Sequence, residues 1–221
     1  MIRILRYLTF RGFMQWLGTV SILGGVVVFL LTFVPILFSE LKYEYNKKKN
    51  IEYVLDDKTI DNQAHIDGNG GLIPIEPINK DFSIVIEKIG VNAPVIPNVS
   101  VSNKVKYGEA LERGVAHADG TVAPGQTGNM TLFAHSSLDF WNMGKYAKVF
   151  NLLGKTNIGD RIVIYYQNKP YVYEIFEKFV VKGWDTSPLT EDFDAPVITL
   201  ITCDPPGTSL NRLVVRGTRI N

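Results

Sequence analysis

Cysteine is nearly absent from this chain of 221 residues, in which Cys203 is the only one. A single cysteine cannot form an internal disulfide, and it excludes a metal site built from several cysteines. Histidine is scarce as well, and the dissimilar spacings of His65, His117 and His135 argue against a zinc site. The short acidic run at 191–194 is more typical of a solvated loop than of a calcium site. We therefore expect no metal and no cofactor.

An excess of charge of either sign is also lacking. The chain has 23 Lys and Arg against 22 Asp and Glu, and no basic stripe runs along it. Binding to nucleic acid depends on basic patches that neutralise phosphates, so no nucleic-acid partner is expected. The hydrophobic share of 46% is typical of a globular protein, with one sizeable domain plus an appendage or with two small domains.

One long stretch near the N-terminus contains no charge at all. Arg11 and Glu40 are separated by 28 uncharged residues, and Trp16–Phe38 is densely apolar. A bilayer core needs about 20 such residues, whereas a cleaved signal peptide has an apolar region of about 7–15 and a small-residue cleavage site. The sequence therefore favours a retained single-pass anchor over residues 1–39. Basic residues flank both ends almost equally, so charge alone leaves the orientation open.

Residues 40–80 have the composition of a stalk or linker. The charged part, 40–58, can continue the membrane helix for a few turns, and 61–71 is polar and rich in glycine. His65 lies in this stretch and is expected to be solvated. A domain over residues 81–221 follows.

The pattern in this domain is that of β-strands. Phe82, Ile84 and Ile86 alternate with other residues, and further apolar or β-branched runs are expected to be strands at 93–96, 130–134, 161–166, 171–181, 197–202 and 212–215. Helical spacing is confined to 107–113 and 145–153. Many short strands separated by turns predict an all-β fold, either a closed barrel or a sandwich.

Cys203 lies where the β-branched run 197–202 gives way to a Pro-Pro-Gly turn. A free cysteine is often a small buried hydrophobe, so a structural role is one interpretation. Its place at the polar exit of a strand favours the other interpretation, a reactive thiol held on a rigid scaffold.

A thiolate nucleophile needs a proton-transfer partner and a group that stabilises an oxyanion. His135 is the candidate partner because it follows an apolar strand, whereas His117 lies in a loop-like segment that no strand delivers to a sheet end. Arg212 begins a strand nine residues after Cys203, and a hairpin return would bring the two together. A solvated edge charge is the alternative interpretation of Arg212.

Several motifs around these residues resemble those of the sortases. Residues 199–203, TLITC, resemble the family's Thr-Leu-x-Thr-Cys signature, and 212–215, RLVV, resemble the arginine strand that follows it. Further matches, in the family's order, are GVAH at 114–117, PGQTGN at 124–129 before the histidine strand, and IGD at 158–160. The resemblance covers residues 82–220, with the predicted membrane segment in front of it.

The resemblance implies a sortase-like closed β-barrel of about eight strands with short helices, preceded by a transmembrane helix. It implies a cysteine transpeptidase of the cell membrane, with the catalytic domain outside the cytoplasm. Such enzymes cleave the Thr–Gly bond of an LPxTG-like C-terminal sorting signal through a thioacyl-enzyme. They then transfer the acyl group to an amine of a cell-wall precursor or a pilin lysine.

Carried over by motif, Cys203 is the nucleophile, His135 the general acid and base, and Arg212 the ligand of the substrate carbonyl. The nine-residue gap between Cys203 and Arg212 is closest to class C sortases. The sequence shows no second apolar span after the domain, no Asp-Pro-aromatic lid motif, and FAHSS around the histidine in place of Gly-His-Arg. A housekeeping-type or divergent sortase therefore stays open.

Two other functions remain as alternatives. A hydrolytic cysteine peptidase of the same fold would pass the thioacyl group to water, and the product ratio with and without amine distinguishes it. A non-enzymatic β module on a membrane stalk would bury an inert Cys203, which a thiol-reactive probe would fail to label.

Overall fold

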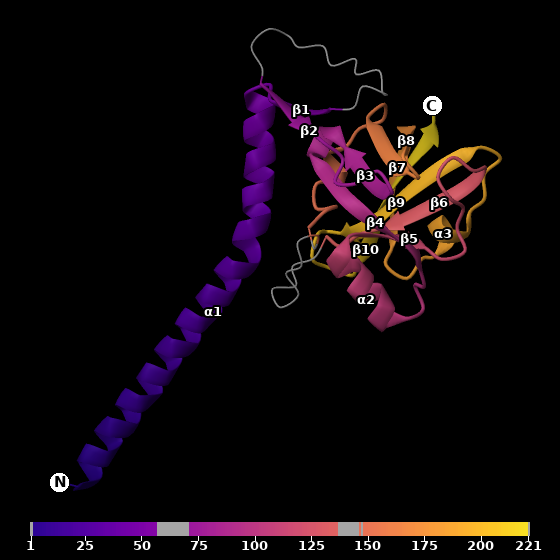
Figure 1. The fold of residues 1–221 in the computed structure, drawn as a ribbon. Helices are drawn as coiled ribbons and strands as arrows, with labels where there is room; N and C mark the ends of the chain where they lie inside the picture. Colours follow the sequence, from indigo (N-terminus) through magenta and orange to yellow (C-terminus); the bar gives the residue numbers. More distant parts are fainter. Residues whose placement is uncertain (1, 57–70, 137–145, 147, 221) are drawn as a thin grey trace. The chain divides into compact units, whose positions relative to one another are not determined.

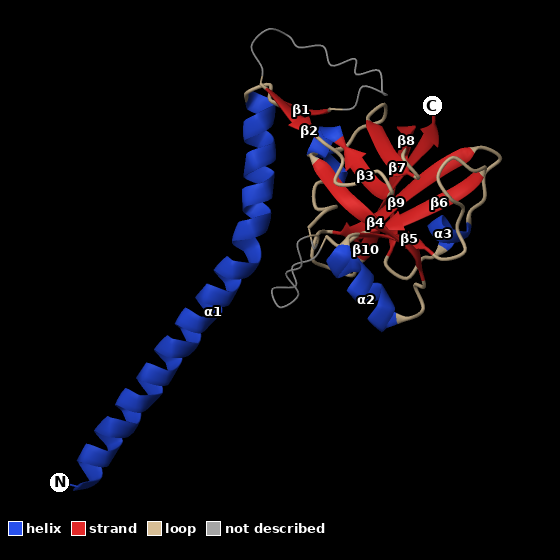
Figure 2. Cartoon of the chain, viewed as in Figure 1, coloured by secondary structure: helices blue, strands red, loops and turns tan. Residues whose placement is uncertain are grey.

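The computed structural model describes residues 2–56, 71–136, 146 and 148–220 of the chain. It contains two compact units, residues 1–38 and the remainder of the chain. Figure 1 gives the order of the elements along the sequence, and Figure 2 shows that strands make up most of the second unit.

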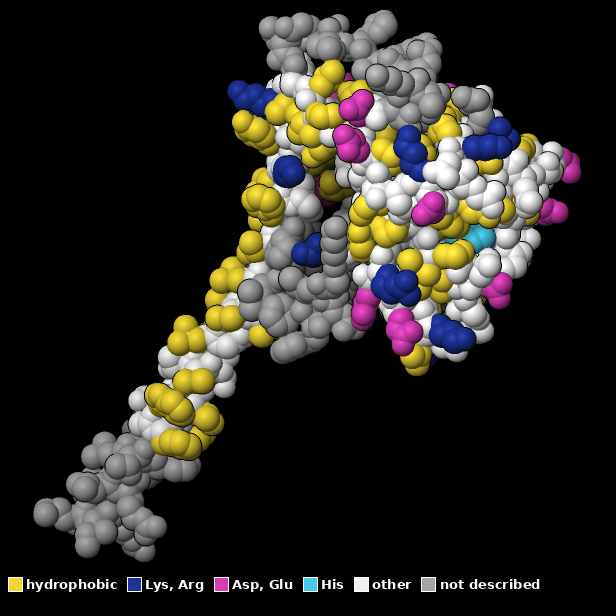
Figure 3. Space-filling model, viewed as in Figure 1, with side chains coloured by type: hydrophobic (Ala, Val, Ile, Leu, Met, Phe, Trp, Pro, Cys, Tyr) yellow, Lys and Arg dark blue, Asp and Glu magenta, His cyan; other side chains and the backbone are white. Residues whose placement is uncertain are grey.

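The first unit consists of most of the helix α1 (Ile2–Lys48), whose last turns belong to the second unit. Its segment Gly12–Leu30 is long and apolar enough to cross a membrane, a property that signal sequences share. The apolar side chains of this segment are exposed, with Trp16 at 62% and Ile22 at 69%, and Figure 3 shows them along the helix. The predicted apolar helix is therefore present.

The second unit is built on a closed barrel in the order β10-β8-β7-β3-β4-β5-β6-β9. The strands are β3 (Phe82–Ile86), β4 (Val91–Val99), β5 (Val115–Ala118), β6 (Gly128–Phe133), β7 (Arg161–Tyr166), β8 (Lys169–Lys182), β9 (Pro196–Asp204) and β10 (Asn211–Arg219). The pairs β4·β5 and β6·β9 are parallel, and the other neighbours are antiparallel. The prediction of an all-β closed barrel of about eight strands is confirmed.

The helices of this unit are short, as expected. They are α2 (Lys104–Arg113), α3 (Ser187–Thr190) and the 3-10 turns η1 (Glu87–Ile89) and η2 (Leu153–Lys155). The expected helix 107–113 lies within α2. The expected helix 145–153 is wrong in its described part, which forms turns and leads into η2, because Asn151 and Gly154 favour turns over a helix. Residues 145 and 147 lie outside the described part of the chain.

The predicted linker contains a small two-stranded parallel sheet, β1 (Glu52–Leu55) and β2 (Leu72–Ile75). Leu55 is fully buried against the barrel, and its backbone N–H donates to Glu87 Oε1 over 2.6 Å. Part of this stretch therefore packs as a structured element. His65 and its neighbours from 57 to 70 lie outside the described residues.

Side chains alternate between the two faces of the barrel strands, and each face carries its own apolar cluster. Leu132, Ala134 and Leu200 belong to the cluster inside the barrel. Phe133 and Ile201 belong to a second cluster on the outer face, which the buried α2 residues Ala110 and Leu111 share. Burial of one such side chain contributes about 1.5–3 kcal/mol, so both faces of β6 and β9 are held firmly.

Candidate active site

The predicted nucleophile and the predicted arginine face each other across two neighbouring strands. Cys203 in β9 is paired with Arg212 in β10. The Arg212 Nη1 atom donates a hydrogen bond to Cys203 Sγ over 3.3 Å and another to the Asn211 carbonyl over 3.1 Å. The expected hairpin return therefore exists, and Arg212 points at the sulfur and not into solvent as a solvated edge charge would.

His135 reaches the same end of the sheet from the other side of β9. In the parallel pair β6·β9, Phe133 is opposite Ile201, and the ladder continues with a hydrogen bond of 3.3 Å from the Ala134 N–H to the Ile201 carbonyl. Ala134 points into the barrel, so the next residue, His135, lies on the outer face. Cys203, two residues after Ile201, lies on that face as well. The fold thus brings the three predicted site residues to one edge.

His117 lies in strand β5, so the expectation of a loop-like segment is wrong, and its side chain is on the inner face of the barrel, whereas His135 is on the outer face. His117 pairs with Leu132, which is interior, and only 4% of its surface is exposed. Its Nε2 atom lies 3.1 Å from the Val122 carbonyl oxygen and 3.0 Å from Thr121 Oγ1. Burial lowers the pKa of His117 below its usual value. Of the two histidines in the described part of the chain, His117 therefore lies inside the barrel, and His135 lies on the outer face that carries Cys203.

Ser136 joins the ends of the two parallel strands, a contact that the sequence did not reveal. Its hydroxyl donates to the Cys203 carbonyl over 2.8 Å, and its own carbonyl accepts from the Gly207 N–H over 2.5 Å. The His135 carbonyl accepts a further bond from the Phe150 N–H over 3.4 Å. These bonds fix the backbone on both sides of the candidate site.

The burial of the site suits chemistry on a thiol. Cys203, His135 and Arg212 are all half-buried. Reactive cysteines are partly exposed and lie beside cations that favour the thiolate, whereas structural cysteines are buried among apolar groups. Cys203 is half-buried and contacts the Arg212 guanidinium.

Tyr107, in the first turn of α2, is a further residue of this region that sequence reasoning missed. Burial raises its pKa, the charge of Cys203 raises it further, and the charge of Arg212 lowers it. The tyrosine hydroxyl therefore lies within the electrostatic reach of both groups. The sequence predicted the helix 107–113 but gave no sign of which strands it would cover.

A buried arginine holds the segment before β9 against the barrel. Arg216 is 4% exposed, bonds to Glu177 Oε2 over 2.9 Å and pairs with Glu191. Its guanidinium lies 4.9 Å from the centroid of the Phe179 ring and 5.1 Å from that of Phe193. The acidic run 191–194, which the sequence suggested to be a solvated loop, thus includes an ion-paired glutamate.

Asn129 supports the same segment from β6. Its Nδ2 atom donates to the carbonyls of Pro188 and Glu191 over 3.0 and 3.2 Å, and its Oδ1 accepts from Thr199 Oγ1 over 2.6 Å. The segment with α3 is therefore bonded to two barrel strands, β6 through Asn129 and β10 through Arg216.

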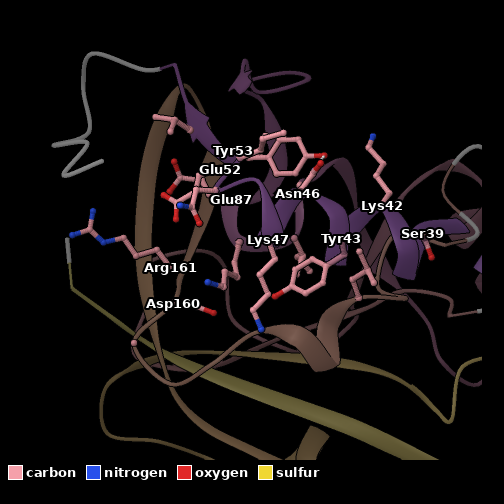
Figure 4. Close-up of a pocket in the computed structure, with 18 residues that line it drawn as sticks. Ser39, Lys42, Tyr43, Asn46, Lys47, Glu52, Tyr53, Glu87, Asp160 and Arg161 are labelled. Carbon is pink, nitrogen blue, oxygen red and sulfur yellow. Dashed lines mark hydrogen bonds between the residues drawn. The ribbon is translucent and has the colours of Figure 1, made fainter. Parts of the chain in front are cut away.

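A pocket of the second unit lies away from these residues. It has a volume of about 690 Å³ and is lined by the last turns of α1, by β1 and η1 and by the start of β7. Figure 4 shows its charged lining, with Glu52 and Glu87 at one end and Lys42 at the other. None of the three candidate site residues lines it. Within the described ranges, no group of three or more His, Cys, Asp or Glu side chains is placed to hold a metal ion.

Comparison with known proteins identifies the family. A family model described as a sortase domain matches residues 84–220, which is more than half of the chain. This chain belongs to the sortase family. Its matched segment contains all three candidate site residues.

The similar sortases come from several classes. Sortase D of Bacillus subtilis (strain 168) is 25% identical over 138 residues, which are 61% of this chain and 61% of that protein. The match thus spans about three fifths of the relative's length. Among solved structures, a Clostridium perfringens Sortase D5 transpeptidase is 28% identical with a TM-score of 0.52, and the match covers 65% of this chain and 80% of that one.

Two further sortase structures are equally similar. A pilus-related Sortase C of Group B Streptococcus is 28% identical with a TM-score of 0.54, covering 65% of this chain and 69% of that one. Sortase A from Corynebacterium diphtheriae is 30% identical with a TM-score of 0.53, and the match covers 65% of this chain and 61% of that one. The likeness extends over classes A, C and D, so it shows the family without selecting the class C that the sequence favoured.

Proposed function

We propose that this sortase is a cysteine transpeptidase in which Cys203 is the nucleophile, His135 the general acid and base, and Arg212 the ligand of the substrate carbonyl. The observation that carries the proposal is the hydrogen bond of 3.3 Å from Arg212 Nη1 to Cys203 Sγ, at the edge where β6 delivers His135. A guanidinium keeps its charge at all physiological pH values, so it can stabilise a developing oxyanion.

In the first half of the reaction, the Cys203 thiolate attacks the carbonyl carbon of the scissile peptide bond. The carbonyl π electrons move to the oxygen, which becomes an oxyanion that Arg212 stabilises. When the oxyanion collapses, the C–N bond breaks and His135, in its protonated form, gives its proton to the leaving amine. The products are a thioester on Cys203 and a free amine.

In the second half, an acceptor amine attacks the thioester carbonyl. His135, now neutral, takes the proton that the amine loses, and the C–S bond breaks to release the Cys203 thiolate. A new amide bond has formed and the enzyme has returned to its starting protonation state.

We infer the substrates from the family resemblance. The acyl donor is a surface protein or pilin subunit with an LPxTG-like C-terminal sorting signal, cleaved between Thr and Gly. The acceptor is an amine of a cell-wall precursor or a pilin lysine. Residues 1–39 anchor the protein in the cell membrane and the catalytic domain lies outside the cytoplasm, where both partners are found.

The test uses the full chain in detergent micelles with a panel of labelled Leu-Pro-x-Thr-Gly-type peptides and a glycine- or lysine-based amine. We expect an amide product and a transient acyl adduct on Cys203, seen by intact-protein mass spectrometry, and neither with Cys203→Ala. Absence of both product and adduct over the whole panel would refute the proposal. Hydrolysis that still exceeds transfer at saturating amine would favour the hydrolytic alternative.

A further inference from the structure

We propose that Tyr107 is a further substrate-contacting residue of this site, whose hydroxyl donates a hydrogen bond to the acyl-donor peptide beside the scissile carbonyl. The inference rests on the proposed function, because it names a residue that the acyl donor meets. No motif in the sequence pointed to this residue.

The register of the barrel defines two rows of side chains on its outer face. In the first row, Phe133 of β6 is opposite Ile201 of β9, and Ile201 is opposite Val214 of β10. The second row lies two residues further along these strands, toward one end of the barrel. It consists of His135, Cys203 and Arg212. Side chains two residues apart on a strand lie on the same face about 6–7 Å from each other, so whatever covers the first row is adjacent to the second.

Tyr107 covers the first row. Its ring meets the Phe133 ring edge-on, with the centroids 6.2 Å apart, and it packs against the cluster that also contains Ile201 and Val214. Aromatic pairs of this geometry hold both rings in place.

The start of α2 keeps this ring in a defined position. Asn103 caps the helix, since its side chain accepts a hydrogen bond from the Lys106 N–H over 3.1 Å and its carbonyl accepts from the Tyr107 N–H over 2.9 Å. A helical side chain leans toward the N-terminus of its helix, so the position of Tyr107 depends on this capped turn.

Tyr107 covers the first row, so its hydroxyl can donate to a ligand bound at the adjacent second row. The charges of Cys203 and Arg212 both influence the pKa of Tyr107, which agrees with a ring packed beside the second row. Among the residues that the structure describes, none accepts a hydrogen bond from this hydroxyl. Tyr107 is half-buried, and a peptide bound at Cys203 would supply a carbonyl to which its hydroxyl can donate.

The first experiment compares Tyr107→Phe with Tyr166→Phe in the full chain in detergent micelles. Tyr166 is the matched control because it also meets a phenylalanine edge-on, Phe82 at 5.0 Å, and lies in β7, which is not a neighbour of β9. Loss of one hydrogen bond to the donor should lower kcat/KM for the peptide about fivefold in Tyr107→Phe. Tyr166→Phe should stay within about twofold of the wild type.

The second experiment tests the placement of the hydroxyl without turnover. The wild type, Cys203→Ser and Arg212→Met are each titrated with pH by ultraviolet absorbance, with and without the additional change Tyr107→Phe. In each background, the difference between the two curves is the ionisation of Tyr107. We expect Cys203→Ser to lower the pKa of Tyr107 and Arg212→Met to raise it, because the first removes a negative charge and the second a positive one. A purely structural tyrosine, far from the pair, would titrate identically in all backgrounds.

The possible failures are distinguishable. If the wild type is active and Tyr107→Phe matches it in kcat/KM, this inference is wrong while the proposed function stands. If neither Cys203→Ser nor Arg212→Met moves the titration, the placement is wrong. If the wild type is inactive on every peptide, the proposed function falls and the donor role of Tyr107 falls with it.

Discussion

Arg212 is the residue whose geometry is most directly tied to the proposed chemistry. Replacing it with Met removes the donor that lies 3.3 Å from Cys203 Sγ and leaves the aliphatic stem in place. Loss of one preorganised oxyanion donor typically costs a factor of about 10²–10³ in rate. We expect a loss of that size in kcat/KM for peptide transfer, measured against Arg219→Met in the same strand. A loss below threefold would remove Arg212 from the mechanism.

His117 should make the stability of the protein depend on pH. Burial holds its folded-state pKa below the ordinary value of 6.5, so between these two values the unfolded chain carries a proton that the folded chain does not. The free energy of unfolding therefore falls as the pH falls through this window, and the loss is complete below the lowered pKa.

The measurement is the thermal midpoint of the wild type and of His117→Gln between pH 7.5 and 5. Other groups contribute to both proteins, so the difference between the two slopes is the quantity of interest. We expect the variant to lose less stability on acidification than the wild type. Equal slopes would show that His117 does not titrate in this range.

At the scale of elements, the ion pairs of Arg216 fasten the α3 segment to β8 and β10. In Arg216→Met the two glutamates keep access to water, since their side chains are 44% and 49% exposed, so the cost is smaller than for a fully buried pair. We expect a loss of about 1–2 kcal/mol from the bonds and ring contacts. Hydrogen exchange at residues 187–195 should become faster, while exchange in β3 stays unchanged; protection equal to the wild type would contradict this role.

The β1·β2 sheet should contribute to the stability of the barrel. Leu55 is fully buried, whereas Leu72 in the partner strand is 40% exposed. Leu55→Ala should cost about 2–5 kcal/mol of unfolding free energy, and Leu72→Ala, the matched control, far less. Denaturant titration of the two variants provides the comparison. A cost for Leu55→Ala as small as that expected for Leu72→Ala would mean that the small sheet does not stabilise the barrel.

Most barrel strands were predictable because their signals are local, and alternating side chains defined β3. The four-residue strand β5 was missed because so short a run after Gly114 has no clear periodicity. Motif order named Cys203, His135 and Arg212 as the expected site, and the structure places them at one end of the barrel. The small sheet was missed because two strands of four residues in a polar, glycine-rich stretch have no periodicity to detect. Tyr107 was missed because its function depends on which strands α2 covers, and that is decided by tertiary packing.

At the scale of the whole molecule, the apolar segment of α1 has the properties of a membrane anchor and of a signal sequence, and the two can be distinguished by experiment. If residues 1–39 are a retained anchor, the mature protein in the membrane fraction keeps its own N-terminal peptide, which mass spectrometry would detect. It should also resist extraction by high salt, because about 20 apolar residues hold it in the bilayer. Recovery of a shortened protein in the soluble fraction would instead identify a cleaved signal.

The closure of the barrel restricts how a peptide can be recognised. Many proteins bind an extended peptide by letting it join the rim of an open sheet as one more strand, with main-chain bonds that any sequence can make. Here β9 is paired with β6 on one side and with β10 on the other. The strand that carries Cys203 therefore has no unpaired edge to which a peptide strand could be added. A bound peptide must lie across the side chains of the outer face. Its affinity is therefore tied to its own side chains, which is the condition an enzyme needs if it is to cut one short motif and spare the rest.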